Sequence, residues 1–198
     1  MFEVCFFLGF LLVSLVCQFV FRKEKRARKI FLALFSLAVF YFLSKAIIST
    51  FLTYRLWQKN PLSHYLLPPY QSISYFLSYS FFHFFRPFVF NFFFSFFLFL
   101  VMVALNDFFQ ERFFEKEEPY LAALASFFCF WPTNLIYLFL VLFLGVVFHF
   151  LYLIFKWREK KRFERRISFY YLWLPLSFFV IIFNHYFVSI PFFEKLLL

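Results

Sequence analysis

The chain has 198 residues, of which 65% are hydrophobic and 15% are charged, and its mean hydropathy is +0.81. Such a composition leaves too little polar surface to cover a water-soluble globule, so an integral membrane protein is expected. The net charge of +10 lies largely in two basic segments, Arg22 to Lys29 and Lys156 to Arg166. Each follows an apolar run, where such charges orient a membrane protein and contact anionic headgroups, so no nucleic-acid partner is expected.

The first apolar run, residues 4–21, is long enough to cross a hydrocarbon core of about 30 Å. It lacks the basic start and the small-residue cleavage site of a signal peptide, so it is expected to remain as the first span. The second run, residues 30–54, is apolar except for Lys45 and a series of hydroxyl groups. Tyr41, Lys45 and Ser49 recur every four residues, which places them on one side of a helix that must face away from lipid.

The next apolar stretch is too long for one upright helix and too short for two. The pair Arg86-Pro87 interrupts it, because proline removes a backbone donor and clashes with the preceding turn. We therefore predict a short interfacial helix over residues 73–85 and a span over residues 88–105. His83 and Arg86 lie on one side of the helix that holds them, and we predict that they bind the phosphate of a lipid headgroup.

Two further spans are predicted in the last third of the chain, over residues 135–155 and 167–190. Residues 120–131 precede Pro132 and form either a half-helix or the kinked start of one long helix. If both basic segments face the same side, an even number of crossings must separate them, and a short crossing at residues 120–131 would provide it. The sequence thus predicts one all-α, polytopic domain over residues 1–198, with about five to six transmembrane helices.

Lys45 carries the strongest functional indication, because it lies near the middle of its apolar run. A lysine at that depth costs about 2.5–3.5 kcal/mol on insertion scales and is normally paired or exposed to a water-filled path. The carboxylates of the chain all lie at the ends of apolar runs. We therefore expect Lys45, with Tyr41 and Ser49, to serve a proton path or an inter-subunit contact. The alternative is a lysine that a neighbouring helix satisfies or that extends toward the interface.

Neither a catalytic constellation nor a metal site is recognisable in the sequence. With 2 glycines and 3 cysteines, the chain has no glycine-rich phosphate loop and no disulfide framework. A serine flanked by glycines, an HExxH motif and a pair of intramembrane aspartates are also absent. The chain is therefore not expected to be an enzyme by itself, and bound phospholipid is the only expected cofactor.

Phenylalanine accounts for 44 residues, including 12 of the 19 from Phe81 to Phe99. Membrane physics does not require this, because burying phenylalanine or leucine stabilises by a similar amount, about 1.5–3 kcal/mol. A U-rich coding bias explains the excess at lipid-facing positions, and the scarcity of glycine indicates few tight helix crossings within the chain. Both features predict a subunit whose packing is completed by other membrane subunits.

This composition resembles that of the Phe-rich membrane proteins encoded in protist mitochondrial genomes, the ciliates in particular. FLFLVMVALND (Phe97 to Asp107) is similar to the end of the third span in the sixth mitochondrially encoded membrane subunit of NADH:ubiquinone oxidoreductase. NPLSH (Asn60 to His64) is similar to an Asn-Pro upstream in that family, whereas FVFNFFF replaces its Tyr-Val-Gly-Ala motif. The resemblance implies a non-catalytic subunit of an oxidative-phosphorylation complex in the mitochondrial inner membrane, contributing to assembly and to proton translocation.

A second resemblance favours a bacterial origin. The segment from Leu144 to Val180 is similar to the tail of bacterial prepilin peptidases, which contains a basic loop and a final span. Those enzymes need two aspartates, of which Asp107 can match the first and no residue matches the second. This resemblance implies a bacterial polytopic protein, either transporter-like or an inactive relative of the peptidases.

Overall fold

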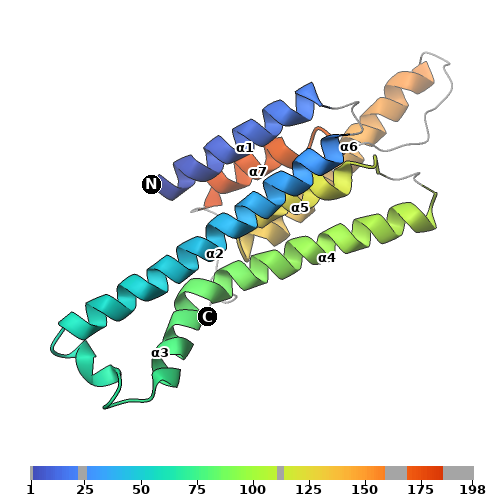
Figure 1. The fold of residues 1–198 in the computed structure, drawn as a ribbon. Coiled ribbons are helices and arrows are strands. Elements are labelled where there is room, and N and C mark those ends of the chain that lie inside the picture. The colour runs from blue at the N-terminus through green and yellow to red at the C-terminus, as the bar shows by residue number, and fades with distance from the viewer. Residues whose placement is uncertain (1, 22–25, 111–113, 159–168, 185–198) are drawn as a thin grey trace.

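The computed structural model describes residues 2–21, 26–110, 114–158 and 169–184, and the side chains of all of these except 2–5 and 155–158. The described residues form helices and turns without a strand, so the predicted all-α fold is confirmed. In chain order (Figure 1), the elements are α1 (Phe2–Val20), α2 (Ala27–Lys59), the 3-10 turn η1 (Ser63–Leu66), α3 (Ile73–Ser80), the π-helical turn η2 (Phe81–Phe85), α4 (Arg86–Phe108), α5 (Glu118–Phe128), α6 (Thr133–Arg158) and α7 (Trp173–Ile182).

Three helical stretches in the described part of the chain are long and apolar enough to cross a membrane: Ala27–Lys59, Ile73–Phe108 and Thr133–Ile154. This is compatible with an integral membrane protein. Two shorter apolar helices, Phe6–Val20 and Trp173–Ile182, coincide with the first and last predicted spans. Length and composition thus support three spans in the described part of the chain, and the five to six predicted are not confirmed. Residues 22–25, 159–168 and 185–198, which include much of both basic segments and the end of the last predicted span, lie outside the described residues.

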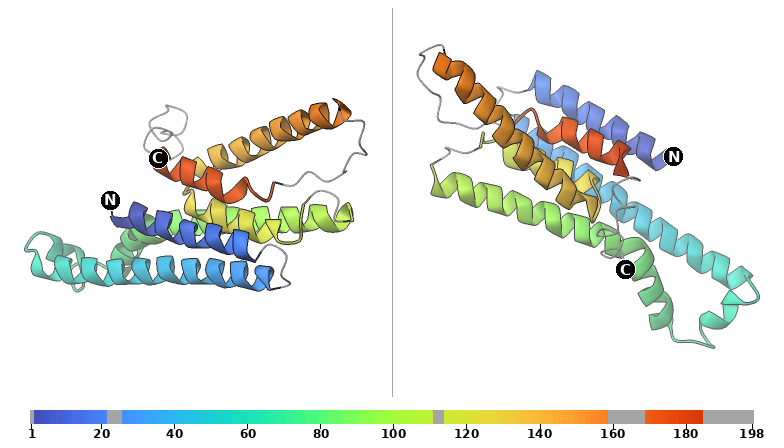
Figure 2. Two further views of the ribbon diagram at one scale, coloured as in Figure 1. Left: turned by 90° about the horizontal axis from the view of Figure 1, so that it is seen from above. Right: turned by 180° about the vertical axis from the view of Figure 1, so that it is seen from behind.

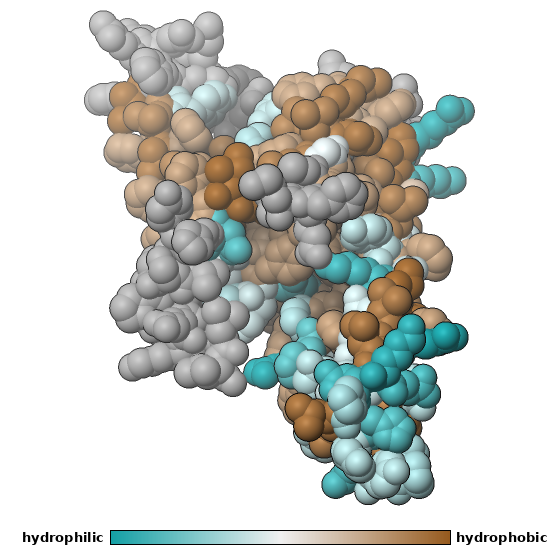
Figure 3. All heavy atoms as spheres, turned by 90° about the vertical axis from the view of Figure 1, so that its left-hand side faces the viewer, coloured by the Kyte–Doolittle hydropathy of each residue, from teal (hydrophilic) through white to brown (hydrophobic). Residues whose placement is uncertain are grey.

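Two long antiparallel stretches, α2 and the continuous run of α3, η2 and α4, meet at a tip that contains η1 (Figures 1 and 2). The predicted boundary at Arg86-Pro87 is a bend and not an end, because Ile73–Phe108 stays helical through it. The π-helical turn widens the backbone just before Pro87, as often happens where a long helix changes direction. Hydrophilic side chains gather at the tip, in contrast to the mostly hydrophobic surface above it (Figure 3).

The centre of the bundle is α5. Ten of its eleven residues are buried, and it packs against α2, α4, α6 and α7. Alanines and a serine make up much of this helix, and such small side chains let neighbouring helices approach closely. The expectation of few tight crossings, drawn from the scarcity of glycine, is therefore wrong at α5, where Ala122, Ala123, Ala125 and Ser126 take the part that glycine often plays.

A helical hairpin is formed by α5 and α6. Helix α5 runs antiparallel to α4. Pro119, at the start of α5, lines a pocket with the last turns of α4. Phe127, at the end of α5, lines another pocket with the first turns of α4. After a break at residues 129–132, α6 runs back toward the side from which α5 started (Figures 1 and 2). Residues 120–131 thus contain a half-helix that ends before Pro132, and the predicted short crossing there is not confirmed, because α5 has only 11 residues.

On the other side of α5, α7 packs against α1 and α6. The Gln18 amide of α1 donates a hydrogen bond to the backbone carbonyl of Tyr170, just before α7. In return, the Tyr170 hydroxyl donates to the Gln18 carbonyl over 3.1 Å. Both side chains are fully buried, so this reciprocal pair fixes the end of α1 against the start of α7.

Candidate functional site

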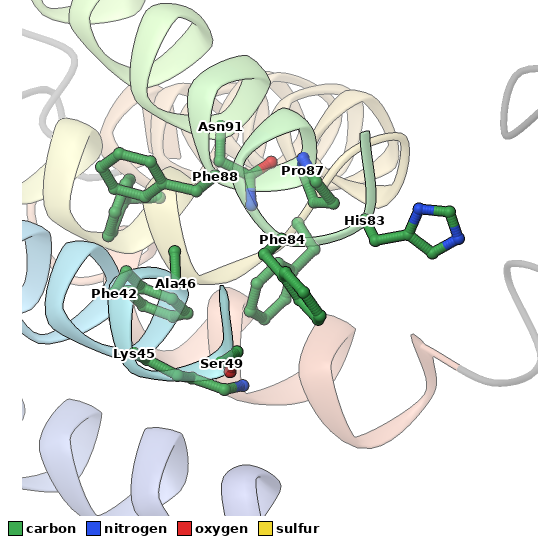
Figure 4. A pocket seen from close by; sticks show the side chains of 11 residues that line it. Phe42, Lys45, Ala46, Ser49, His83, Phe84, Pro87, Phe88 and Asn91 are labelled. Carbon is green, nitrogen blue, oxygen red and sulfur yellow. The ribbon is translucent and has the colours of Figure 1, made fainter. Parts of the chain in front are cut away.

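A pocket of about 160 Å³ lies where the middle of α2, the start of α4 and the α5–α6 break meet. Its polar lining comes from Lys45 and Ser49 of α2, His83 of η2 and Asn91 of α4 (Figure 4). The walls between these groups are largely aromatic, formed by Phe42, Phe84, Phe88, Phe127 and Phe130.

The structure brings together residues that the sequence assigned to two separate sites. Lys45 and Ser49 lie one turn apart on α2, and His83 reaches the same pocket from η2. The Lys45 side chain is half-buried and interacts with another group of the protein. Tyr41 does not line this pocket, because its ring stacks on Phe6 of α1 at a centroid distance of 4.2 Å.

His83 and Arg86 do not converge on one point. The His83 ring stacks on Tyr79 at 4.0 Å, and its Nδ1 donates to the Tyr79 carbonyl over 3.0 Å in the tautomer protonated there. The ring is directed away from Lys45 (Figure 4). The Arg86 guanidinium carbon lies 5.9 Å from the Phe82 ring centre and 5.7 Å from that of Phe90. Cation–π contacts of this kind hold the Arg86 guanidinium against the phenylalanine rings, away from the pocket.

Polar side chains satisfy the backbone where the helix breaks. The Asn91 side-chain oxygen accepts a hydrogen bond of 2.6 Å from the backbone N–H of Trp131. The Thr133 hydroxyl donates to the carbonyl of Cys129 and, over 3.0 Å, to that of Phe130. Non-helical backbone within an apolar bundle needs such partners, because water is not there to replace the lost helical bonds. Asn91 therefore has a structural task at this pocket as well as a place in its lining.

Phe130 adopts an unusual backbone conformation at the break. Its φ is 48°, in the left-handed region that bulky residues rarely occupy. The ring of Phe130 packs on Phe7 at 5.3 Å and on Phe42 at 5.7 Å. Conformations of this type cost about 1–3 kcal/mol and persist where the surroundings hold them, so packing from α1 and α2 maintains the break.

Sequence reasoning did not identify the polar core that runs along α4. The buried residues of this helix form one stripe facing the bundle, and Ser95 in that stripe accepts a 2.9 Å hydrogen bond from Ser126 of α5. A recognisable signal exists, since Asn91, Ser95 and Asn106 interrupt the phenylalanine run at spacings that fall on one helix face. Asn134, at the start of α6, is fully buried, and neither polar atom of its amide has a hydrogen-bond partner.

Within the described residues, no group of three or more His, Cys, Asp or Glu side chains is placed to hold a metal ion. Comparison with known protein families, curated proteins and solved structures finds no match. The fold and the pocket therefore define the class: an all-α protein whose described part contains three helices long and apolar enough to span a membrane, and a polar pocket beside a helix break.

Proposed function

We propose that this chain is a non-catalytic transmembrane subunit of a hetero-oligomeric complex of oxidative phosphorylation in the mitochondrial inner membrane. In this proposal, α1 and α7, extended by their flanking residues, also cross the membrane, and with the three long helices they give five spans, within the predicted five to six. The chain contributes to assembly of the complex and, through Lys45, to proton translocation. The phenylalanine excess supports the mitochondrial part of the proposal.

The observation that carries the proposal is the outer half of α6. This segment, residues 146–154, diverges from the rest of the bundle (Figures 1 and 2). Large apolar side chains are exposed on all its sides, which is typical of helices buried in a membrane or in a larger assembly. They are Val146, Phe148, Phe150, Leu151, Tyr152 and Ile154.

A partner subunit accounts for this segment better than lipid alone. A helix that needs only lipid around it gains nothing by leaving its own bundle, whereas a projecting helix offers its whole circumference to neighbouring chains. Packing between helices in lipid depends on close contact, and the projecting half of α6 is placed to make such contact with other subunits.

Site-specific photocrosslinking tests the proposal. A photoreactive residue at Phe148 or Phe150 is expected to form an adduct with a polypeptide that mass spectrometry identifies as a respiratory or ATP synthase subunit. In the matched control, the photoreactive residue replaces Phe93. The Phe93 side chain is equally apolar and 63% exposed, but it belongs to α4, which packs in the bundle and does not project from it. Lipid adducts alone at all three positions, or a purified chain that is stable and monodisperse by itself, would refute the proposal.

The role assigned to Lys45 is tested separately. Lys45→Leu removes the charge from the pocket while it keeps a side chain of comparable bulk. We expect impaired assembly or slowed proton translocation, measured by native electrophoresis and by pH-gradient formation in inverted inner-membrane vesicles. Ser44→Leu, at the neighbouring α2 position that does not line the pocket, is the control. Intact assembly and unchanged proton translocation in Lys45→Leu would remove this part of the proposal.

A second candidate, a bacterial transporter-like protein, is favoured by the α5–α6 hairpin beside the polar pocket. Transporters often place their binding sites at interrupted helices, where freed backbone groups and polar side chains meet. The gene distinguishes the two candidates: UGA codons at Trp57 or Trp131, or organellar neighbours, favour the mitochondrial subunit. Uptake of a solute by the reconstituted chain alone would favour the transporter.

A further inference from the structure

Two adjoining pockets lie between α2 and α4, on the face of α5 that these helices flank. The first, of about 170 Å³, is at the start of α2 and the end of α4, and its charged lining residues are Arg28, Asp107 and Lys116. The second, of about 230 Å³, is lined mainly by apolar side chains, including Phe35, Phe96 and Ala123. A charged chamber and an apolar chamber thus meet between the same two helices.

The lining residues of the two chambers form one strip along α2. Tyr120 of α5 lines both of them. On α2, Arg28 of the charged chamber is followed one and two turns later by Leu32 and Ser36 of the apolar one. At 1.5 Å per residue, the strip from Arg28 to Ser36 is about 12 Å long. It therefore extends from the basic end of α2 toward the middle of the molecule.

The charged chamber is built for a headgroup of mixed charge. Arg28 and Lys116 are exposed cations that can hold a phosphodiester. Asp107 supplies one carboxylate in the same lining. The Asn106 amide oxygen accepts a 3.0 Å hydrogen bond from the Phe114 N–H, which fixes the amide at the chamber wall. Two cations and one anion complement a headgroup that carries a phosphate and an ammonium.

The apolar chamber suits an acyl chain. Rings from α2 and α4 form its two walls, and Ala123, with its small side chain, lies between them on α5. The chamber, of about 230 Å³, is too small to hold even two turns of a helix about 10 Å in diameter. An extended hydrocarbon chain in this chamber makes van der Waals contacts with the phenylalanine walls in place of its contacts with other lipid tails.

We propose that this groove binds an aminophospholipid, with its phosphodiester held by Arg28 and Lys116, its ammonium beside Asp107 and one acyl chain along Phe35, Phe96 and Ala123. The site is distinct from the pocket around Lys45, with which it shares no lining residue. The inference rests on the membrane location in the proposed function, and it does not depend on the identity of the complex.

Lipid binding to the full chain in phosphatidylcholine nanodiscs tests the site, with phosphatidylethanolamine, phosphatidylglycerol and inorganic phosphate as separate probes. We expect tighter binding of phosphatidylethanolamine than of phosphatidylglycerol. The double variant R28Q/K116Q is expected to weaken binding of both lipids about tenfold, because each cation contributes to holding the phosphate. D107N is expected to abolish the preference for the amine headgroup.

The acyl-chain chamber has its own variant and control. Ser36→Trp places a large side chain from an exposed position into the chamber, and we expect about a tenfold loss of affinity for both lipids. Leu37→Trp, at an exposed neighbouring position outside both chambers, and Arg55→Gln, at the far end of α2, should bind like the wild type. Circular dichroism verifies that each variant is folded.

Three results would overturn the inference. The first is unchanged lipid affinity in both R28Q/K116Q and Ser36→Trp, and the second is binding of inorganic phosphate as tight as that of the lipids. The third is a polypeptide, instead of lipid, crosslinked to a photoreactive residue at Leu32. Alkaline carbonate extraction separates this outcome from failure of the membrane proposal: a chain that stays in the membrane without a lipid preference refutes the lipid site alone, whereas a released chain refutes the membrane location.

Discussion

Asn91→Leu is expected to loosen the α5–α6 break. The Asn91 side chain is 1% exposed, and its oxygen accepts the Trp131 N–H at 2.6 Å. Leucine branches at Cγ like asparagine and is somewhat larger, so the change removes the acceptor without leaving a cavity. The Trp131 N–H then loses its partner in apolar surroundings, which costs about 1–3 kcal/mol. For a chain of this length, a loss of that size lowers the melting temperature by about 2–12 °C.

Two measurements check this expectation in detergent or nanodiscs. Thermal unfolding followed by circular dichroism reports the global change in stability. Maleimide labelling of Cys129, in a background without Cys5 and Cys17, reports local opening, because the Cys129 thiol is 1% exposed beside the break. We expect a lower melting temperature and faster Cys129 labelling in Asn91→Leu.

Asn60→Leu is the matched control. The Asn60 side-chain oxygen also accepts a backbone N–H, that of Leu62 at 2.9 Å, but on the exposed tip of the molecule. Water can replace the lost acceptor there, so the change should cost less than about 0.5 kcal/mol. If Asn91→Leu matched Asn60→Leu in melting temperature and left Cys129 labelling unchanged, the reasoning that Asn91 sustains the break would be refuted.

Two further substitutions probe the packing of α6. Gly145→Ala should destabilise the chain by about 1–3 kcal/mol, seen as a lower melting temperature, because an added Cβ would lie 1.6 Å from the buried Phe169 ring; an unchanged value would show that the ring moves aside freely. Asn134→Leu should instead raise the melting temperature, because it removes a buried amide without a hydrogen-bond partner. A fall in the melting temperature of Asn134→Leu would show that the amide does have a stabilising partner.

The helical segments were predictable from the sequence because apolar runs of a given length leave few other structures in lipid. Residues 30–54 and 135–155 fall within α2 and α6. The even number of crossings expected between the two basic segments led to a predicted short crossing at residues 120–131. The structure has a half-helix, α5, at this place. Run length and charge report how much chain is apolar, and they do not report whether a helix passes through the bundle or turns back within it.

The candidate site was predictable in part. The four-residue spacing correctly placed Lys45 and Ser49 on a common face of α2, and the structure places both in one pocket. Tyr41 shares the spacing but packs on α1, because a helix face is wide enough to serve two neighbours. His83 joins Lys45 only through the antiparallel pairing of two distant segments, which helical periodicity cannot reveal.

By itself, the sequence determined the all-α character of the chain, the segments that form the long apolar helices and the basic flanks, because these follow from local hydrophobicity and charge. Tertiary structure alone decided that α5 becomes the buried centre, that Asn91 caps the break across the bundle and that two chambers join between α2 and α4. The physical reason is that these features depend on contacts between segments distant in the chain, and in a chain this rich in phenylalanine one apolar face looks much like another.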